Sequence, residues 1–350
     1  MKHNLLASKQ ASKQASKQAS KQASKQARIS YVDLFRAFGI LLMIMGHVGF
    51  GTHFDKWIHA FHMPLFFFIS GFFYKDIFNT EKFKNRIISR VKSLLIPYFV
   101  FAIISYIVDF LLNGYNVNSL RLFLFNTDEG GIPISGALWF LTALFFADII
   151  YSLLDLLLEF RILHFAVIIL SIIGFGISSI FPFQIPFGIA VSLVGIGFIH
   201  IARMIKKYQP LQKLYKLNVV ISSSVVVITS ILIFVNGYVN LRTCSYGFIP
   251  LFYFNSIGII IGFWNLCRIV DSHISEKTWL YQRVISIGEN SILYLCLNQV
   301  VIIIIRKCCS ILGLDGIASS NIILIITIGS ISIIGEIIMK SKIKCIFGKM

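Results

Sequence analysis

Two apolar runs near the beginning of the chain constrain its fold more than any other feature. They cover residues 32–50 and 58–74 and are separated by a short polar break. Each run approaches the roughly 20 apolar residues with which an α-helix crosses a bilayer. The ionisable residues within them are Asp33, Arg36, His47, His59 and His62. Because charge facing lipid is costly, we expect these side chains to face a protein interior or a wet cavity.

The composition places the chain among polytopic membrane proteins. Of its 350 residues, 57% are hydrophobic and only 13% are charged, and the mean hydropathy is +0.81. A soluble domain of this length does not carry so much apolar surface. The net charge of +17 suggests nucleic acid at first sight, but the cations lie in short segments between apolar runs. We therefore expect membrane lipid, and no nucleic acid, as a partner.

We count ten candidate spans and expect an all-α polytopic membrane fold in which residues 29–350 form one domain. The spans lie near 32–50, 58–74, 94–112, 137–158, 163–181, 185–203, 217–235, 247–266, 286–305 and 321–339. If the N-terminus is cytoplasmic, the cytoplasmic segments hold 26 of the 32 Lys and Arg residues and the outer loops hold five. This asymmetry predicts about ten transmembrane helices with both termini cytoplasmic. Pro64 falls within the second run and predicts a kink there.

Residues 1–28 form a polar, basic tail that we expect to be disordered. From Ala7 to Gln26 the unit Ala-Ser-Lys-Gln occurs five times and offers no apolar face to a core. The tail also lacks the apolar segment of a signal peptide. The tetranucleotide GCAA, read through successive frames, encodes Ala, Ser, Lys and Gln. The tract is therefore either a slippage-prone switch of expression or a repetitive peptide linker encoded by other codons.

His47 and His62 are the first candidates for chemistry. His47 lies 11 residues beyond Arg36, or roughly 16 Å along a helix, and the returning second run brings His62 to a similar depth. Two imidazoles there can accept and donate protons near neutral pH. Alternatively, His47 caps a helix end and His62 bonds a carbonyl that Pro64 leaves without a donor. Asp33 and Arg36, three residues apart, share a helix face and can pair.

The segment 75–92 is a second constellation and carries six Lys and Arg residues. Arg86 and Arg90 are four residues apart on one helix face, and Lys92 follows them. Guanidinium groups match phosphate oxygens, so this segment can bind a nucleotide, coenzyme A or a lipid headgroup. The alternative is that its charges only orient the protein in the membrane. We assign a structural role to Asp148, and the six cysteines show no metal-ligand spacing.

Several short motifs occur together in a recognisable order. They are D-x-x-R at 33–36, GH at 46–47, FHMPLFFFISG at 61–71, LLIPYF at 94–99, GALWFL at 136–141 and IGENS at 287–291. With this order the chain, from residue 29 to about 305, resembles the integral-membrane acyltransferase-3 family, and most of all the branch of fucose 4-O-acetylase and related enzymes. Members have about ten spans and move acetyl or other acyl groups, generally from cytoplasmic acyl-CoA, to sugars of surface glycans.

The resemblance implies roles for individual residues. The implied set comprises the catalytic histidines His47 and His62, the supporting residues Asp33, Arg36 and Trp139, and the donor-binding residues Arg86, Arg90 and Lys92. Many relatives carry a histidine late in the ninth span, where this chain has Asn298 within YLCLNQVV. We therefore assign no proton transfer to that stretch.

The function that the resemblance implies is O-acetylation in a bacterial cytoplasmic (inner) membrane. Acetyl-CoA would be the co-substrate and a hydroxyl of a surface glycan, such as lipopolysaccharide or capsule, or of a lipid-linked sugar would be the acceptor; we expect no bound cofactor and no metal. The alternatives are a transporter or flippase of a glycolipid or small anionic solute, because buried charge also suits transport, and an acyl-binding sensor without turnover. Transporters often have two similar halves, whereas the polar residues here concentrate in the first 100 positions.

The repeat tract yields the first testable prediction. Deleting all five units in frame should leave catalysis intact, because the tract has no apolar face with which to join a packed core. Sequencing sibling colonies should find a GCAA tract whose copy number varies and toggles expression. Mixed synonymous codons would exclude slippage, and a dead enzyme after in-frame deletion would reveal a role for the tail in the protein itself.

Overall fold

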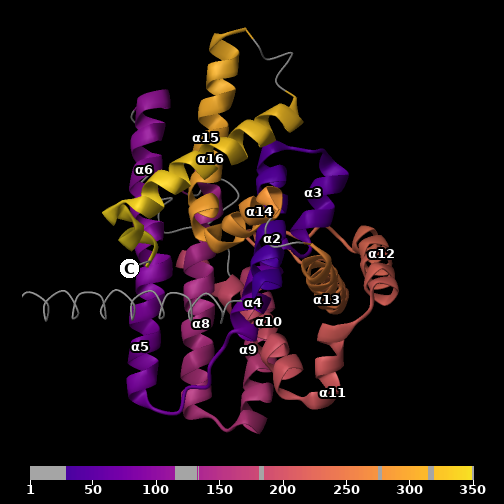
Figure 1. Cartoon of the computed structure of the whole chain (residues 1–350). Helices are drawn as coiled ribbons and strands as arrows, with labels where there is room; N and C mark the ends of the chain where they lie inside the picture. The colour runs from indigo at the N-terminus through magenta and orange to yellow at the C-terminus, as the bar shows by residue number, and fades with distance from the viewer. Residues whose placement is uncertain are drawn as a thin grey trace, which may run out of the picture.

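Figure 1 shows a computed structural model of the chain, which describes residues 29–114, 132, 134–180, 185–274, 278–313 and 319–348. The predicted disorder of residues 1–28 lies outside these ranges. Within them every regular element is helical, and the predicted all-α class is confirmed.

The helices and helical turns are α2 (Ser30–Val48), α3 (Thr52–His59), α4 (His62–Phe72), α5 (Thr80–Arg90), η1 (Val91–Leu95), α6 (Ile96–Asn113), η2 (Gly136–Leu138), α8 (Trp139–Leu157), α9 (Phe160–Ile180), η3 (Pro186–Gly188), α10 (Ile189–Lys207), α11 (Gln209–Gln212), η4 (Lys213–Lys216), α12 (Val219–Val235), α13 (Ile249–His273), α14 (Trp279–Glu289), α15 (Ser291–Ile311), α16 (Ser320–Lys340) and η5 (Lys342–Phe347).

Eight helices in the described part of the chain are long and apolar enough to cross a membrane. A ninth is added if α12 and the segment before it, bent by 90° at their junction, count as one broken span. The protein is therefore a multi-pass membrane protein. Two of the ten expected spans are not among the eight: the run 58–74 does not form one continuous helix, and the run 217–235 counts only as part of this broken span. The cytoplasmic placement of the termini stays a prediction.

The break in the second run lies at Ala60 and Phe61, between α3 and α4. Pro64 accounts for its position, because a proline ring clashes with the carbonyl four residues earlier and supplies no N–H to it. That carbonyl, on Ala60, instead accepts a hydrogen bond of 2.5 Å from Ser256 Oγ. The remaining α4 has 11 residues, or roughly 16 Å of helix, which is too short for a bilayer core of about 30 Å.

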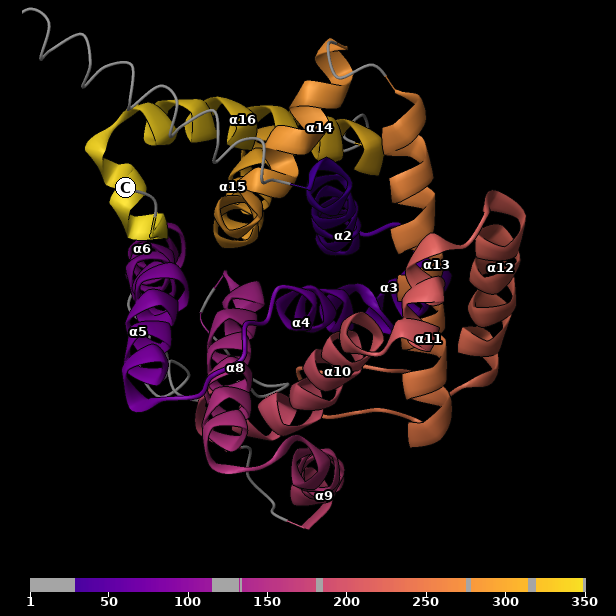
Figure 2. The same cartoon turned by 60° about the horizontal axis from the view of Figure 1, so that its bottom comes forward.

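Helix α4 lies at the centre of the molecule (Figure 2), and all of its residues except Phe66 are buried. Its main neighbours are α10 and α2. The contact with α10 is close enough to require glycine at position 71, where an added Cβ would lie 2.1 Å from the carbonyl oxygen of Ile199. A similar approach joins α14 to α2, where a Cβ on Gly288 would lie 1.8 Å from the carbonyl oxygen of Asp33. These two crossings fix α2 and α4, which carry four of the eight predicted site residues.

Helices α5 and α6 form one rod of 34 residues, visible at the left of Figure 1. The five residues of η1 join them as a π-helical turn, so the helix continues without a break but with one wider turn. Single π-helical turns within α-helices frequently occur at functional sites. Arg90 immediately precedes this turn, and Lys92 and Ser93 lie within it.

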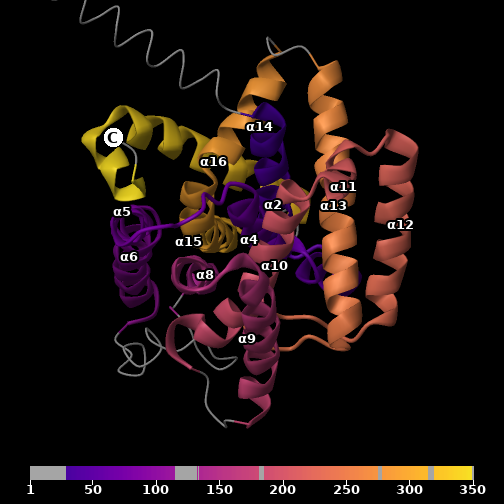
Figure 3. The same cartoon turned by 90° about the horizontal axis from the view of Figure 1, so that it is seen from below.

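Helices α12 and α13 run side by side at one edge of the molecule (Figure 3). This pair also holds α3, because Trp57 Nε1 donates to Ser230 Oγ at 2.9 Å and Lys56 Nζ donates to the carbonyl oxygen of Phe234 at 3.1 Å. The short helix α3 is thus fixed from the side, although it is too short to be stable alone.

The α4–α10 crossing predicts a large effect for one methyl group. Gly71→Ala should lower the free energy of unfolding by about 2–3 kcal/mol or more, because the new Cβ meets backbone that can move only if a helix moves. Thermal unfolding in detergent and membrane abundance would measure the loss. Gly329→Ala in α16 is the matched control, since no atom lies within 4 Å of the place where its new Cβ would be. Equal stability of the two variants would contradict the tight crossing.

Candidate functional site

Three histidines from adjoining segments meet in one pocket, which we call the histidine pocket. It has a volume of about 120 Å³. Its lining residues are Met43, His47, His59, His62, Met63, Gly136, Ala137, Trp139, Asn240, Leu241, Arg242 and Gln299. The predicted pair His47 and His62 and the supporting Trp139 therefore do lie together, and His59 joins them.

His47 is held from α15. Gln299 Nε2 lies 3.3 Å from His47 Nδ1, and Gln299 Oε1 accepts a hydrogen bond of 2.7 Å from the backbone N–H of Ala137. The amide side chain of Gln299 thus joins three predicted spans: the first at His47, the fourth at Ala137 and the ninth, to which Gln299 belongs. The alternative in which His47 caps a helix end is not what the geometry shows, because its Nδ1 faces this amide.

His62 and His59 are each tied to the backbone one helical turn earlier. His62 Nδ1 lies 2.7 Å from the carbonyl oxygen of Ile58, and His59 Nδ1 lies 2.9 Å from that of Asp55. Pro64 leaves the carbonyl of Ala60 without a donor. His62 contacts the carbonyl of Ile58 instead, so it does not compensate for the proline as the alternative interpretation of His62 proposed. The two imidazoles meet edge to face, with centroids 5.1 Å apart.

His59 has a second partner in Asp55, whose Oδ1 lies 3.2 Å from His59 Nδ1. The other carboxylate oxygen accepts a hydrogen bond of 2.6 Å from the hydroxyl of Tyr238. Burial and the Asp55 carboxylate raise the pKa of Tyr238 above its ordinary value, so its hydroxyl keeps its proton and donates it. Tyr238, Asp55 and His59 thus form a hydrogen-bonded chain that ends in the pocket.

Gly136 makes room for two polar groups at the pocket wall. A Cβ there would lie 3.0 Å from Arg242 Nη1 and 3.9 Å from Gln299 Nε2. Trp139, three residues later, is buried with only 7% of its surface exposed. It contributes to the pocket wall, in keeping with a supporting role.

A second cavity, which we call the arginine pocket, has a volume of about 270 Å³. Its polar lining includes Arg36, Ser70, Arg90, Ser93 and Glu289, and the remainder is mostly apolar. Arg36 is paired with Asp33 at 2.8 Å, as predicted from their spacing, and its guanidinium lies over the ring of Phe73. Of the three predicted donor-binding residues only Arg90 lines this pocket.

Arg86 and Arg90 share a single partner, Asp148 of α8. Arg86 binds it through Nε at 2.7 Å and through Nη2, and Arg90 binds it through Nε at 2.8 Å and Nη2 at 3.0 Å. Ser70 Oγ on α4 also donates to this carboxylate, at 3.2 Å. Asp148 is fully buried, so these partners are what permit a carboxylate there. Lys92, by contrast, is exposed.

The two pockets are lined by the same faces of shared helices. On α2, Arg36 and Ile40 line the arginine pocket, and Met43 and His47 line the histidine pocket. These positions are four, three and four residues apart, which places them on one helix face. Helices α4, α8 and α15 likewise contribute to both linings. The histidines and the arginines therefore lie along one axis through the helix bundle.

Apolar side chains occupy the stretch where the two linings meet. Met43 and Met63 belong to the histidine pocket, and Phe66 and Phe140 belong to the arginine pocket. The rings of Phe66 and Phe140 have centroids 5.8 Å apart. Side chains of methionine and phenylalanine therefore lie between the two pockets.

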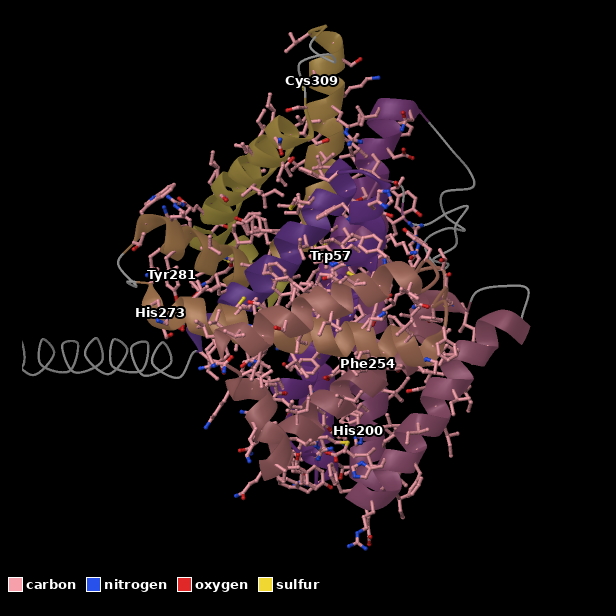
Figure 4. All side chains as sticks on the ribbon, turned by 90° about the vertical axis from the view of Figure 1, so that its right-hand side faces the viewer. Trp57, His200, Phe254, His273, Tyr281 and Cys309 are labelled. Atoms are coloured by element: carbon pink, nitrogen blue, oxygen red, sulfur yellow. The ribbon has the colours of Figure 1, made fainter. Side chains whose placement is uncertain are left out.

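Another polar cluster lies away from both pockets. His200, labelled in Figure 4 well below Trp57 of α3, bonds His164 at 2.6 Å and the hydroxyl of Tyr151 at 2.8 Å. Arg203 continues this cluster to Asp155 and Asp76, at 2.7 Å each, and so anchors the segment that leads into α5. Over the described ranges, no three His, Cys, Asp or Glu side chains are placed to hold a metal ion.

The comparison with known protein families gives the decisive observation. The family described as an acyltransferase domain, of the acyltransferase-3 type, matches residues 29–340, about nine-tenths of the chain. The chain belongs to the acyltransferase-3 family. It is thus a membrane-bound acyltransferase, and both pockets lie within the matched region. No curated protein and no solved structure matches the chain significantly.

Several residues of the candidate site could not be predicted from the sequence. Asn298 stood where relatives carry a histidine, but its amide nitrogen bonds carbonyls of its own helix, at 2.7 and 3.0 Å. The next residue, Gln299, is the one that contacts His47. Arg242, which lines the histidine pocket, was not singled out from the sequence, and Asp148 was given a structural role without a partner. The sequence offered one sign of the role of Gln299, namely that it is a polar residue next to Asn298 in an apolar span.

The Asp148 cluster predicts a rescue between variants. Arg86→Ala with Arg90→Ala should cost about 3–5 kcal/mol and reduce membrane abundance, because a buried carboxylate loses both cations. Adding Asp148→Asn should restore abundance by removing the uncompensated charge. Lys92→Ala is the control: it removes an exposed cation of the same segment and should leave abundance unchanged. A double variant as abundant as wild type would contradict the buried pairing.

Proposed function

We propose that this acyltransferase is an O-acetyltransferase that moves an acetyl group from cytoplasmic acetyl-CoA to a hydroxyl of a bacterial surface glycan. Its membrane would be the bacterial inner membrane. The acceptor would be lipopolysaccharide, capsule or a lipid-linked sugar, as in the branch that contains fucose 4-O-acetylase. The repeat tract would make this modification phase-variable.

The observation that carries this proposal is the alignment of the two pockets along shared faces of α2, α4, α8 and α15. One pocket holds imidazoles, which suit proton transfer to and from a sugar hydroxyl. The other pocket holds guanidinium groups, which suit the phosphates of an acetyl-CoA donor. A sugar hydroxyl is a poor nucleophile and needs such a base, and the thioester carbonyl needs a hydrogen-bond donor as charge develops on it.

The donor end of the proposal is supported by shape and charge together. The arginine pocket is mostly apolar and would accept the slender acyl-pantetheine arm, directed toward Met43 and Phe66. Because Asp148 already neutralises part of the charge on Arg86 and Arg90, we assign the phosphates jointly to Arg90 and to the exposed lysines of the same rod, Lys84 and Lys92. The arginine pair then also shapes the pocket, by holding α5 against α8.

The acceptor end is supported by an open groove of about 620 Å³ beside the histidine pocket. Phe50, Phe54 and Tyr238 contribute aromatic surface to it, and Asp55 contributes a carboxylate. Aromatic faces with a few convergent polar groups are typical of sites for small polar ligands such as sugars. Asp55 links the groove to the pocket through His59.

Membranes containing the protein should transfer label from acetyl-CoA to the glycan and raise the glycan mass by one acetyl group. Unlabelled coenzyme A should compete, because it shares the donor's phosphates and pantetheine arm. His47→Ala should abolish transfer at normal membrane abundance. The matched control is His273→Ala, which removes an imidazole that lines neither pocket. Uptake of a solute or glycolipid flipping without acetylation would instead support the transporter or flippase interpretation.

A further inference from the structure

The hydrogen bonds around His47 determine which of its ring nitrogens carries the proton. A backbone N–H can only donate, so the contact from Ala137 identifies the Gln299 atom it meets as the carbonyl oxygen. The other end of that side chain is therefore the NH₂ group, and it donates to His47 Nδ1. Neutral His47 must then carry its own proton on Nε2. His47 presents a hydrogen-bond donor, and not a lone pair, at that nitrogen.

The other two histidines have the opposite tautomer. His59 Nδ1 faces two oxygens of Asp55, and His62 Nδ1 faces the carbonyl oxygen of Ile58. All of these oxygens can only accept, so both Nδ1 atoms carry protons. Neutral His59 and His62 therefore keep a lone pair on Nε2. Either of them can act as a base, whereas His47 cannot do so at the nitrogen that carries its proton.

Only one of these two bases has a carboxylate beside it. An imidazolium needs compensation when it leaves water. Among the described residues, Asp55 beside His59 is the only carboxylate within 4 Å of a histidine of the pocket. His62 is buried, with 6% of its surface exposed, and its partner is a neutral carbonyl. Asp55 is in turn held by the Tyr238 hydroxyl, so the carboxylate is fixed in the position that stabilises a charged His59.

The position of His59 also suits the acceptor. Asp55 and Tyr238 line the open groove, and His59 lines the histidine pocket. His59 therefore stands where a sugar hydroxyl entering from the groove would first meet the narrow pocket. Its side chain is 26% exposed, so water-borne molecules can reach it.

We infer that His59 is a catalytic residue of the proposed acetyl transfer, that Asp55 is its positioning residue, and that His47 acts as a hydrogen-bond donor. The inference rests on the proposed function. The acceptor oxygen attacks the thioester carbonyl carbon and its proton passes to His59 Nε2. The new oxyanion accepts a hydrogen bond from His47 Nε2–H. The C–S bond then breaks, its electron pair stays on sulfur, and the proton on His59 passes to that sulfur, giving ester and free thiol.

Loss of His59 followed by chemical rescue tests the base. His59→Asn keeps an N–H that can donate to Asp55 but has no base, and it should lower the transfer rate at least about 100-fold with the Michaelis constant for acetyl-CoA within about twofold of wild type. His59→Ala leaves a space, and imidazole added to the membranes should restore transfer at least fivefold. Asp55→Asn should cost roughly three- to tenfold, because the backbone carbonyl of residue 55 still fixes the tautomer.

His273→Ala is the control, since His273 Nδ1 makes the same bond to a carbonyl one turn earlier, at 2.7 Å from Ile269, outside both pockets. It should keep wild-type transfer and show no imidazole response. His47→Gln keeps an N–H for the oxyanion and should transfer at least about tenfold faster than His47→Ala.

Four results would overturn the inference while leaving the proposed function in place. They are His59→Asn with more than a third of wild-type transfer, His59→Ala unaffected by imidazole while normally abundant, Asp55→Asn with unchanged transfer, and His47→Gln as inactive as His47→Ala. If His59→Ala does not accumulate, the Asn variant and the His47 pair decide. A wild-type protein that transfers no acetyl group would overturn the proposed function, and this inference with it.

Discussion

The buried carboxylate of Asp148 is the group on which the arrangement of the site depends. A charge without exposure to water is tolerated only when its partners are complete, and here they come from two other elements, two arginines from α5 and one serine from α4. The same α4 carries His62 at its other end. The carboxylate therefore fixes Arg86 and Arg90 and, through the 11 residues of α4, is connected to His62 in the histidine pocket. Helix α4 thereby connects the Asp148 cluster to the linings of both pockets.

The fold class was predictable from hydrophobicity alone, because apolar runs of membrane length leave few alternatives. The number of membrane spans was harder to predict from hydrophobicity. The run from 58 to 74 has the length and composition of a membrane helix, but Pro64 divides it, and its second half is surrounded by protein rather than lipid. Length and hydropathy do not distinguish a helix buried in a bundle from one that faces lipid. The close helix contacts at Gly71 and Gly288 could not be predicted either, because the neighbours of these glycines belong to distant segments of the chain.

The site was predictable in part, and the pattern of misses has a physical explanation. His47 and His62 could be paired because a short connection brings two adjacent helices to one depth, and Asp33 and Arg36 because helical spacing places them on one face. Gln299 and Asp148 lie far along the chain from their partners, so only the packed structure relates them. The structure also adds information that residue types do not carry. The direction of each hydrogen bond distinguishes His47 from His59, although the two side chains are chemically identical.

The π-helical turn between α5 and α6 changes the direction in which the side chains of α5 point relative to those of α6. A π-helical turn accommodates one residue more than an α-helical turn, and each residue of an α-helix advances the side-chain direction by about 100°. Removing a single residue from Val91–Leu95 would leave the rod intact and its two ends equally helical. It would nevertheless rotate Arg86 and Arg90 by about a quarter of a turn relative to the apolar face of α6. One extra residue thus allows the same rod to present cations to Asp148 and the side chains of Tyr98, Phe101 and Ala102 to the bundle.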